Sequence, residues 1–215
     1  TRKNINEAIE IFKNLIARKN HVPSMFELGS IYIKEMESEE QLRVAVDLLN
    51  SAVKGGNADA MNLLGCCYLQ GNGVDINVDK AVYYFREASK AGNTLGKVNL
   101  AQCYIEGKGV PLDQEKGYKL LKEAPQDDPS AKFRIGVCLY KGAGVKGDKQ
   151  EGIKLLKEAA SQGDLDALCY YGKLLLVGKD VEMNKEAAFS YFKIASQKGH
   201  PESKYQLGVF YENGD

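Results

Sequence analysis

The chain has 215 residues, and its 29 lysines and arginines balance its 29 aspartates and glutamates, so the formal net charge is zero. Phosphate binding requires clustered positive charge, so this balance argues against nucleic acid as a general partner. The sequence has no apolar run near the roughly 20 residues that span a bilayer, and it begins Thr-Arg-Lys-Asn without the apolar stretch of a signal peptide. We therefore expect no membrane contact by this segment.

An internal repeat of about 36 residues runs through the sequence. A small residue recurs at steps of 36, 36, 35, 36 and 36, as Gly29, Gly65, Ala101, Gly136, Gly172 and Gly208. An alanine follows each of the first five by 23 residues, as Ala52, Ala88, Ala124, Ala159 and Ala195. Self-similarity of this length predicts a solenoid of stacked supersecondary units.

The predicted elements follow this period along the chain. Residues 5–16 carry Ile5, Ile9, Phe12 and Ile16 at helical spacing, which predicts the second helix of a preceding unit over 1–20. Five repeats follow over 23–56, 57–92, 93–128, 129–164 and 165–200, and 201–215 is a partial repeat. We expect both ends to be cut inside repeats, and the whole of 1–215 to form one all-α domain. Its expected fold is a right-handed α/α superhelical solenoid of about five and a half helix-loop-helix repeats.

Residues 57–92 show the pattern within one repeat. Apolar and small residues at three- and four-residue steps predict a first helix, helix A, and the glycine at 71 is expected to end it in a left-handed conformation. A second helix, helix B, is expected from Asp79 to Ala91, with Gly92 closing the unit. Because glycine on helix A and alanine on helix B allow paired helices to approach to about 8 Å, these columns predict the helix contacts.

The recurring residues carry a family resemblance. The columns Leu64-Gly65-x-x-Tyr68, Gly71-x-Gly73-Val74, Ala81, Phe85, Ala88 and Gly92 resemble the Sel-one-like repeat (SLR) family, a tetratricopeptide-like α-solenoid, over about residues 23–215. The pattern departs where Glu35 and Glu37 replace loop glycines, where Asp180 follows Gly178, and where Pro125 should shorten the third helix B. The resemblance implies a non-catalytic scaffold or adaptor that binds other proteins.

The five cysteines are expected to be buried thiols. Cys67, Cys103 and Cys138 share a repeat column with isoleucine, leucine and phenylalanine, and free cysteine behaves as a small apolar residue. Neighbouring repeats place equivalent residues about 8 to 10 Å apart, beyond the reach of a disulfide. This favours a reducing, cytoplasmic location, with no metal and no cofactor.

Two motifs and two histidines suggest chemistry that we do not expect. Gly142-Ala-Gly-Val-Lys-Gly147 matches a dinucleotide fingerprint, but no strand precedes it. Ser51-x-x-Lys54 matches a motif of penicillin-recognising enzymes without its companion motifs. His21 and His200 lie near repeat junctions and are expected to be solvated turn residues. We therefore expect no catalytic residue and no enzyme, with a helical-repeat enzyme, a β-lactam-binding protein or an architectural spacer as alternatives.

The binding surface is expected on the concave face lined by helix A. Positions that vary between repeats while the packing columns stay constant should face outward, and they lie three and four residues apart on one helix face. The candidate residues are Asn99, Gln102, Glu106, Phe133, Arg134, Val137, Lys141, Tyr170 and Lys173. Amides, cations and aromatic rings together predict a peptide or protein ligand with an acidic group, and the alternative is that these are ordinary solvated residues.

The last helix A lacks a following helix B in this sequence. We expect it to expose Leu207, Phe210 and Tyr211, because its apolar face has no partner helix. Any dimer of this fragment is therefore expected to arise from the truncated C-terminal repeat.

Overall fold

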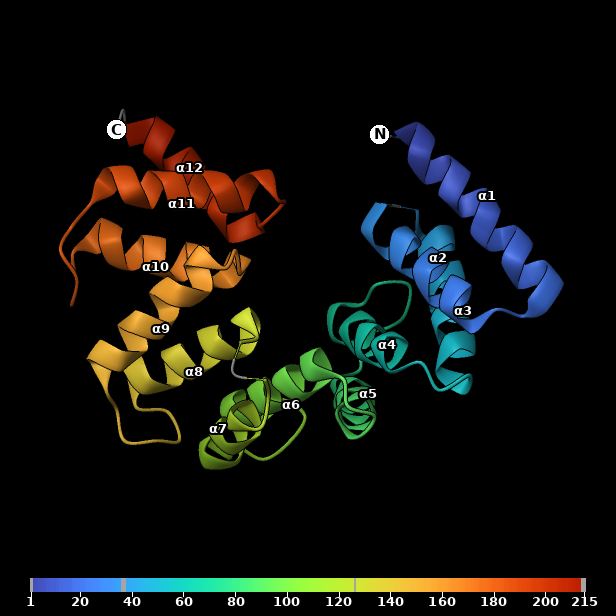
Figure 1. Cartoon of the computed structure of the whole chain (residues 1–215), viewed down its shortest axis with the longest axis horizontal. Helices are drawn as coiled ribbons and strands as arrows, with labels where there is room; N and C mark the ends of the chain where they lie inside the picture. The colour runs from blue at the N-terminus through green and yellow to red at the C-terminus, as the bar shows by residue number, and fades with distance from the viewer. Residues whose placement is uncertain (1, 36–37, 126, 214–215) are drawn as a thin grey trace. The chain divides into compact units, whose positions relative to one another are not determined.

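The computed structural model describes residues 2–35, 38–125 and 127–213, so Glu37, one of the expected departures from the loop pattern, lies outside it. Within these residues the chain forms twelve helices and no strand, which confirms the all-α repeat fold (Figure 1). The helices are α1 (Arg2–Lys19), α2 (Val22–Glu35), α3 (Glu39–Lys54), α4 (Ala58–Gln70), α5 (Val78–Lys90), α6 (Thr94–Glu106), α7 (Gln114–Lys122), α8 (Pro129–Lys141), α9 (Lys149–Ser161), α10 (Leu165–Val177), α11 (Lys185–Gln197) and α12 (Pro201–Asn213).

The chain divides into two compact units, Thr1–Leu112 and Asp113–Asp215. In unit 1, α2 packs on α3 and α4 packs on α5, while in unit 2 α8 packs on α9 and α10 packs on α11 (Figure 1). These are the predicted pairs of helix A and helix B. The grouping of all residues into one solenoid domain stays a prediction.

The small residues of the repeat lie at the helix contacts. A Cβ atom added to Gly65 would lie 2.6 Å from the ring of Phe85, and one added to Gly172 would lie 2.8 Å from the ring of Phe192. The alanine column of helix B is fully buried at Ala88 and at its equivalents Ala52, Ala159 and Ala195. Since side chains larger than these would overlap the facing helix, the structure supports the steric interpretation at Gly65 and Gly172.

The loop between helix A and helix B is held by glycines with positive φ. Gly71 ends α4 at φ 81° with its N–H bonded to the carbonyl of Cys67. Gly73, at φ 70°, lies so close to α3 that an added Cβ would be 2.3 Å from the carbonyl oxygen of Leu42. The loop therefore fits against the preceding helix B only when this position lacks a side chain.

The loop of the fifth repeat, between α10 and α11, solves the same problem with a different residue. Asp180 has φ 62° although it is not glycine. Its carboxylate accepts a hydrogen bond of 2.8 Å from the hydroxyl of Tyr140 and one of 3.0 Å from Lys149. These contacts tie the loop to α8 and α9, and they offset the strain of a left-handed aspartate.

Pro125 shortens the third helix B as predicted. Helix α7 has nine residues, whereas α5, α9 and α11 have thirteen each. The ring of a proline clashes with the preceding turn and its nitrogen has no proton to donate, so the helix ends before it.

The terminal helix differs in part from the expectation. Tyr211 is 65% exposed as predicted, but Phe210 is only 4% exposed, so its predicted exposure is wrong. Its ring packs on Phe189 and Phe192 of α11, at centroid distances of 5.7 and 5.9 Å. The helix B of the preceding repeat therefore covers this position.

Candidate functional site

The predicted binding residues fall on helix A of three repeats and in both units. Asn99, Gln102 and Glu106 lie on α6 in unit 1, while the other six lie on α8 and α10 in unit 2. Glu106 and Lys141 are exposed, Phe133 is buried, and the remaining six are half-buried. Each unit therefore offers its own helix A surface.

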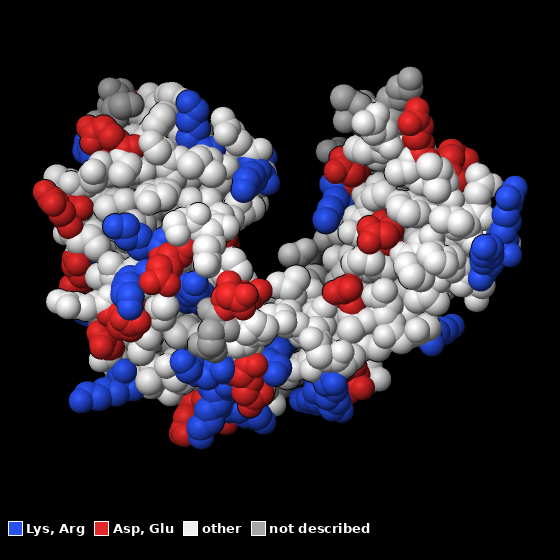
Figure 2. All heavy atoms as spheres, in the orientation of Figure 1, with Lys and Arg blue, Asp and Glu red and all other residues white. Residues whose placement is uncertain are grey.

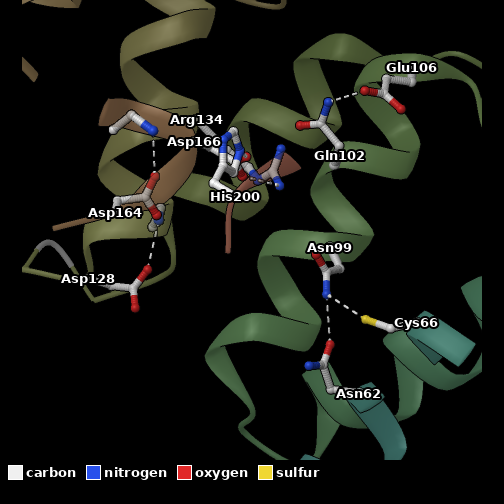
Figure 3. Close-up of polar contacts among 12 residues, drawn as sticks. Asn62, Cys66, Asn99, Gln102, Glu106, Asp128, Arg134, Asp164, Asp166 and His200 are labelled. Carbon is white, nitrogen blue, oxygen red and sulfur yellow. Dashed lines mark hydrogen bonds and ion pairs between the residues drawn. The ribbon is translucent and has the colours of Figure 1, made fainter. Parts of the chain in front are cut away.

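In unit 1, the predicted amides mostly bond to neighbouring side chains. The side-chain amide of Asn99 donates to Oδ1 of Asn62 at 2.8 Å and to the sulfur of Cys66 at 3.8 Å, both on α4 (Figure 3). Gln102 donates to Glu106 one turn later on α6. Asn62 is 9% exposed and Asn99 is half-buried, so their bond joins two successive A helices at a partly buried point.

In unit 2, the face of α8 and α10 is built around an aromatic ring. Tyr170 is half-buried, and its ring meets Phe133 at 6.0 Å and Tyr140 at 6.4 Å in edge-to-face arrangements. The ammonium of Lys141 lies 5.8 Å from the centre of the Tyr170 ring. Burial raises the pKa of Tyr170. The ring of the buried Phe133 thus packs against Tyr170, and the charge of Lys141 is exposed to solvent beside it.

The two other predicted cations have acidic partners within the chain. A guanidinium nitrogen of Arg134 lies 4.0 Å from Asp166, and the ammonium of Lys173 lies 2.6 Å from Glu202. Both acids lie in the first turn of the next helix A, where negative charge is favoured by the helix dipole. The hydrogen bond from Lys173 lowers the pKa of Glu202. A ligand carboxylate would have to compete with these acids.

His200 corrects a prediction, because it is not a solvated turn residue. Its side chain is 14% exposed, and Nδ1 accepts a hydrogen bond from the backbone N–H of Ser203 at 3.2 Å. Since Nδ1 is an acceptor, the ring proton lies on Nε2, which donates to Asp166 at 3.2 Å (Figure 3). His200 therefore caps α12 and bonds to the preceding helix A, while His21 is exposed as expected.

The repeat register could have revealed this role. Position 200 falls in the column of Asn57, Asn93, Asp128 and Asp164, and each of these side chains accepts a backbone N–H as the cap of a helix A. The side chain of Asn93 also donates to Asp59 of the preceding repeat at 2.7 Å, as His200 does to Asp166. The cap column therefore joins neighbouring repeats.

Ser203, His200 and Asp166 form a hydrogen-bonded series that resembles a hydrolase triad. The hydroxyl of Ser203 lies 2.8 Å from Nδ1 of His200, but Ser203 is 0% exposed. A substrate cannot reach a buried hydroxyl, and His21 makes the same contact with Ser24 at 2.8 Å on α2. The series is therefore a capping arrangement, with no accessible nucleophile.

The other chemical motifs also have local structural roles. Gly142 ends α8 and the loop that follows contains no strand, so the glycines over 142–147 belong to the helix A loop. The hydroxyl of Ser51 donates to the carbonyl of Asp47 within α3. In the described part of the chain, no three histidines, cysteines, aspartates or glutamates are grouped to hold a metal ion.

The cysteines are free thiols, and four of the five are buried. Burial raises the pKa of Cys67 to about 12 and that of Cys138 to about 11. Thiols with such pKa values are protonated at neutral pH, so they are poor nucleophiles and poor metal ligands.

Charge is mixed on the face of the molecule that Figure 2 draws. On the face drawn in Figure 2, basic and acidic side chains alternate in each unit without a broad field of one sign. Among the described residues, no helix is both long and apolar enough to cross a bilayer.

Comparison with known proteins places the chain in a family. The profile of the Sel1 repeat matches residues 58–93, 95–124, 129–164, 165–200 and 201–215, so the chain belongs to the Sel1 repeat family. Proteins of this family generally mediate protein–protein interactions and act as scaffolds. No protein of curated function matches the sequence.

Solved structures share the fold at low sequence identity. A Sel1 repeat protein from Oxalobacter formigenes is 21% identical with a TM-score of 0.71, over 100% of this chain and 91% of that one. A putative Sel1 repeat protein from Klebsiella pneumoniae is 18% identical with a TM-score of 0.60, over 88% and 93%. An immunity protein from Pseudomonas aeruginosa is 20% identical with a TM-score of 0.63, over 85% and 67%.

Proposed function

We propose that this chain is a non-catalytic scaffold that holds a protein segment on the helix A face of unit 2, centred on Tyr170. The observation that carries the proposal is the half-buried Tyr170 ring, which Phe133 supports and Lys141 borders. Aromatic side chains of this kind, held rigid by their neighbours, supply much of the binding energy at protein interfaces. Membership of a family of interaction proteins supports the same function.

The face continues along α10. Val177 lies seven residues after Tyr170, so the two share one side of the helix, and Val177 is 69% exposed. Tyr170 and Val177 give this face two apolar positions about two helical turns apart, with Lys173 between them and Lys141 beside Tyr170. The partner we propose is therefore a peptide or protein segment with apolar anchors and an acidic group that meets Lys141.

We propose one cation, Lys141, as the contact for the acidic group of the partner, whereas the sequence suggested three. Arg134 and Lys173 are paired with Asp166 and Glu202, so replacing either cation also changes contacts between repeats. Lys141 is exposed, and its replacement tests the charge of the partner with less structural consequence.

We also propose a cytoplasmic location, which the free and protonated thiols support.

The proposal is tested by affinity capture from native extract with two matched variants. Val177→Arg places a charge on the helix A face, while Ile194→Arg changes a residue of α11 that is 44% exposed. Neither substitution enters the core, so both proteins should melt like the parent. We expect the captured partner to be lost with Val177→Arg and kept with Ile194→Arg.

The charge of the partner is measured with Lys141→Glu. We expect its affinity for the identified partner to fall about tenfold, because an attraction becomes a repulsion. Capture that survives Val177→Arg would reject the helix A face. Capture lost only with Ile194→Arg would move the site to helix B.

A further inference from the structure

A cavity of about 360 Å³ lies in unit 2 beside the C-terminal end of the short helix α7. Its walls come from α7 and the adjoining Pro125, and from the two helices that follow, α8 and α9. It shares no lining residue with the face around Tyr170, so it is independent of the proposed function. Its volume falls in the lower part of the range of about 300 to 1,000 Å³ found for ligand pockets.

The departure from the repeat at Pro125 explains why the cavity exists. Helix α7 ends at Lys122, four residues earlier than a helix of thirteen residues that begins at the same point would end. Pro125 itself lines the cavity. The final turn present in the other B helices is therefore missing here, and the surfaces of α8 and α9 are left uncovered at this point.

Part of the wall of the cavity is apolar. Ile135 and Leu139 of α8 and Leu155 of α9 line it, and Ile135 is only 5% exposed. Tyr118 of α7 contributes its ring, and burial raises the pKa of Tyr118, so the phenol stays protonated at neutral pH. An apolar group of a ligand would replace water against these side chains.

Three charged residues give the cavity its polar character: Lys122, which is exposed, Lys132, which is half-buried, and Glu151. Lys132 lines the cavity with its side chain 12% exposed, and its ammonium lies 3.6 Å from Glu158. An ammonium has three N–H donors, so one acceptor at this distance leaves it able to bind a second. Glu151, the acidic residue of the lining, lies 3.3 Å from Lys154 on its own helix, which offsets its charge.

We propose that this cavity is a binding site for an apolar group that carries a carboxylate. The apolar part lies against Leu139 and Leu155, and the carboxylate binds the ammonium of Lys132. This chemistry occurs in small aryl or alkyl carboxylic acids and in peptide segments where a leucine or phenylalanine adjoins an acidic residue. Both sources use the same contacts, and the experiment separates them.

The test follows the methyl groups of the cavity by NMR in the whole protein. The small-molecule probe is 3-phenylpropionate, its neutral control is 3-phenylpropanamide, and the peptide probe is acetyl-Glu-Leu-amide. We expect saturable shifts of the Ile135 and Leu139 methyl signals with a carboxylate probe. The amide should bind about tenfold more weakly, because it lacks the charge that Lys132 attracts.

Two matched variants test the role of the cation. Lys132→Met keeps the aliphatic stem and removes the charge, while Lys157→Met removes an exposed charge of α9 outside the cavity. We expect about tenfold weaker carboxylate binding with Lys132→Met and no change with Lys157→Met, in proteins with equal melting temperatures.

Each outcome decides the proposal. Binding of 3-phenylpropionate alone assigns the site to small acids, and binding of the peptide alone assigns it to a protein segment. Equal affinity for the acid and the amide, or unchanged affinity in Lys132→Met, would overturn the role of the carboxylate. No methyl shift with either carboxylate probe at about 10 mM would overturn the site itself.

Discussion

Asp180 occupies the loop position at which Gly73, Gly109 and Gly144 have φ values of 70°, 68° and 72°. Its own φ is 62°, and its carboxylate is bonded by Tyr140 and Lys149. The sequence predicted a departure at this residue but not its consequence, because the partners lie 40 and 31 residues away in the chain. The repeat alignment shows that aspartate stands in place of glycine, and only the fold shows which contacts hold it in a left-handed conformation.

The Asp180 contacts predict a dependence of stability on pH at both ends of the range. Hydrogen bonds from Tyr140 and Lys149 lower the pKa of Asp180, so its contribution is present above the unfolded pKa and is lost as the pH falls through the folded one. The same bond raises the pKa of Tyr140 to about 12. Its contribution is present below the ordinary tyrosine pKa of about 10 and is lost as the pH rises towards 12.

NMR titration of the tyrosine ring carbons checks this prediction. In the parent, the pKa of Tyr140 should lie above the ordinary tyrosine pKa of about 10. In Asp180→Asn the difference should shrink, because an amide accepts a weaker hydrogen bond than a carboxylate. An unchanged Tyr140 titration in this variant would show that the bond does not hold in solution.

At the scale of the helices, one glycine column meets two different environments. A Cβ on Gly172 of α10 would lie 2.8 Å from Phe192, whereas a Cβ on Gly208 of α12 has nothing within 4 Å. The period predicted both positions equally well, since both residues are glycine in the same register. The helices and their pairing could be predicted because small residues recur at fixed positions of the repeat. An ion pair such as that of Lys173 with Glu202 could not, because it depends on how two side chains from different repeats are placed in the fold.

This difference gives a matched pair of substitutions. Gly172→Leu should lower the free energy of unfolding by roughly 1 to 3 kcal/mol, because the added side chain overlaps α11. Gly208→Leu should be neutral or stabilise by up to about 1 kcal/mol, since glycine is the poorer helix former. Urea unfolding followed by circular dichroism measures both. Equal losses in the two variants would reject the packing interpretation of the column.

Across the whole molecule, the architecture was more predictable than the binding surface. Helix order, the αL glycine at Gly71 and the short α7 follow from residues that act within one repeat. The role of His200 was missed because a histidine cap is chemically unlike the asparagine and aspartate caps of the same column. The cations at 134 and 173 were expected to meet a ligand, and their acidic partners come from the following repeat.

The thiols give a prediction at this scale. In the native protein, a thiol reagent at neutral pH should modify the half-buried Cys66 first, because the four other cysteines are buried. Burial also raises the pKa of Cys66, so even this reaction should be slow. All five thiols should react in denaturant, and a reducing agent should not change the melting temperature. If protein denatured without a reducing agent shows fewer than five reactive thiols, the native protein contains a disulfide.

The cap column has a consequence for the order of unfolding. Because His200 caps α12 and also bonds to Asp166 of the repeat before it, opening of α12 removes a contact from α10. Stability in such an array depends on nearest neighbours, so opening of α12 should weaken α10. Amide hydrogens of α12 should therefore exchange with solvent before those of α10. Weakening the contact between His200 and Asp166 should change the exchange rates of both helices together.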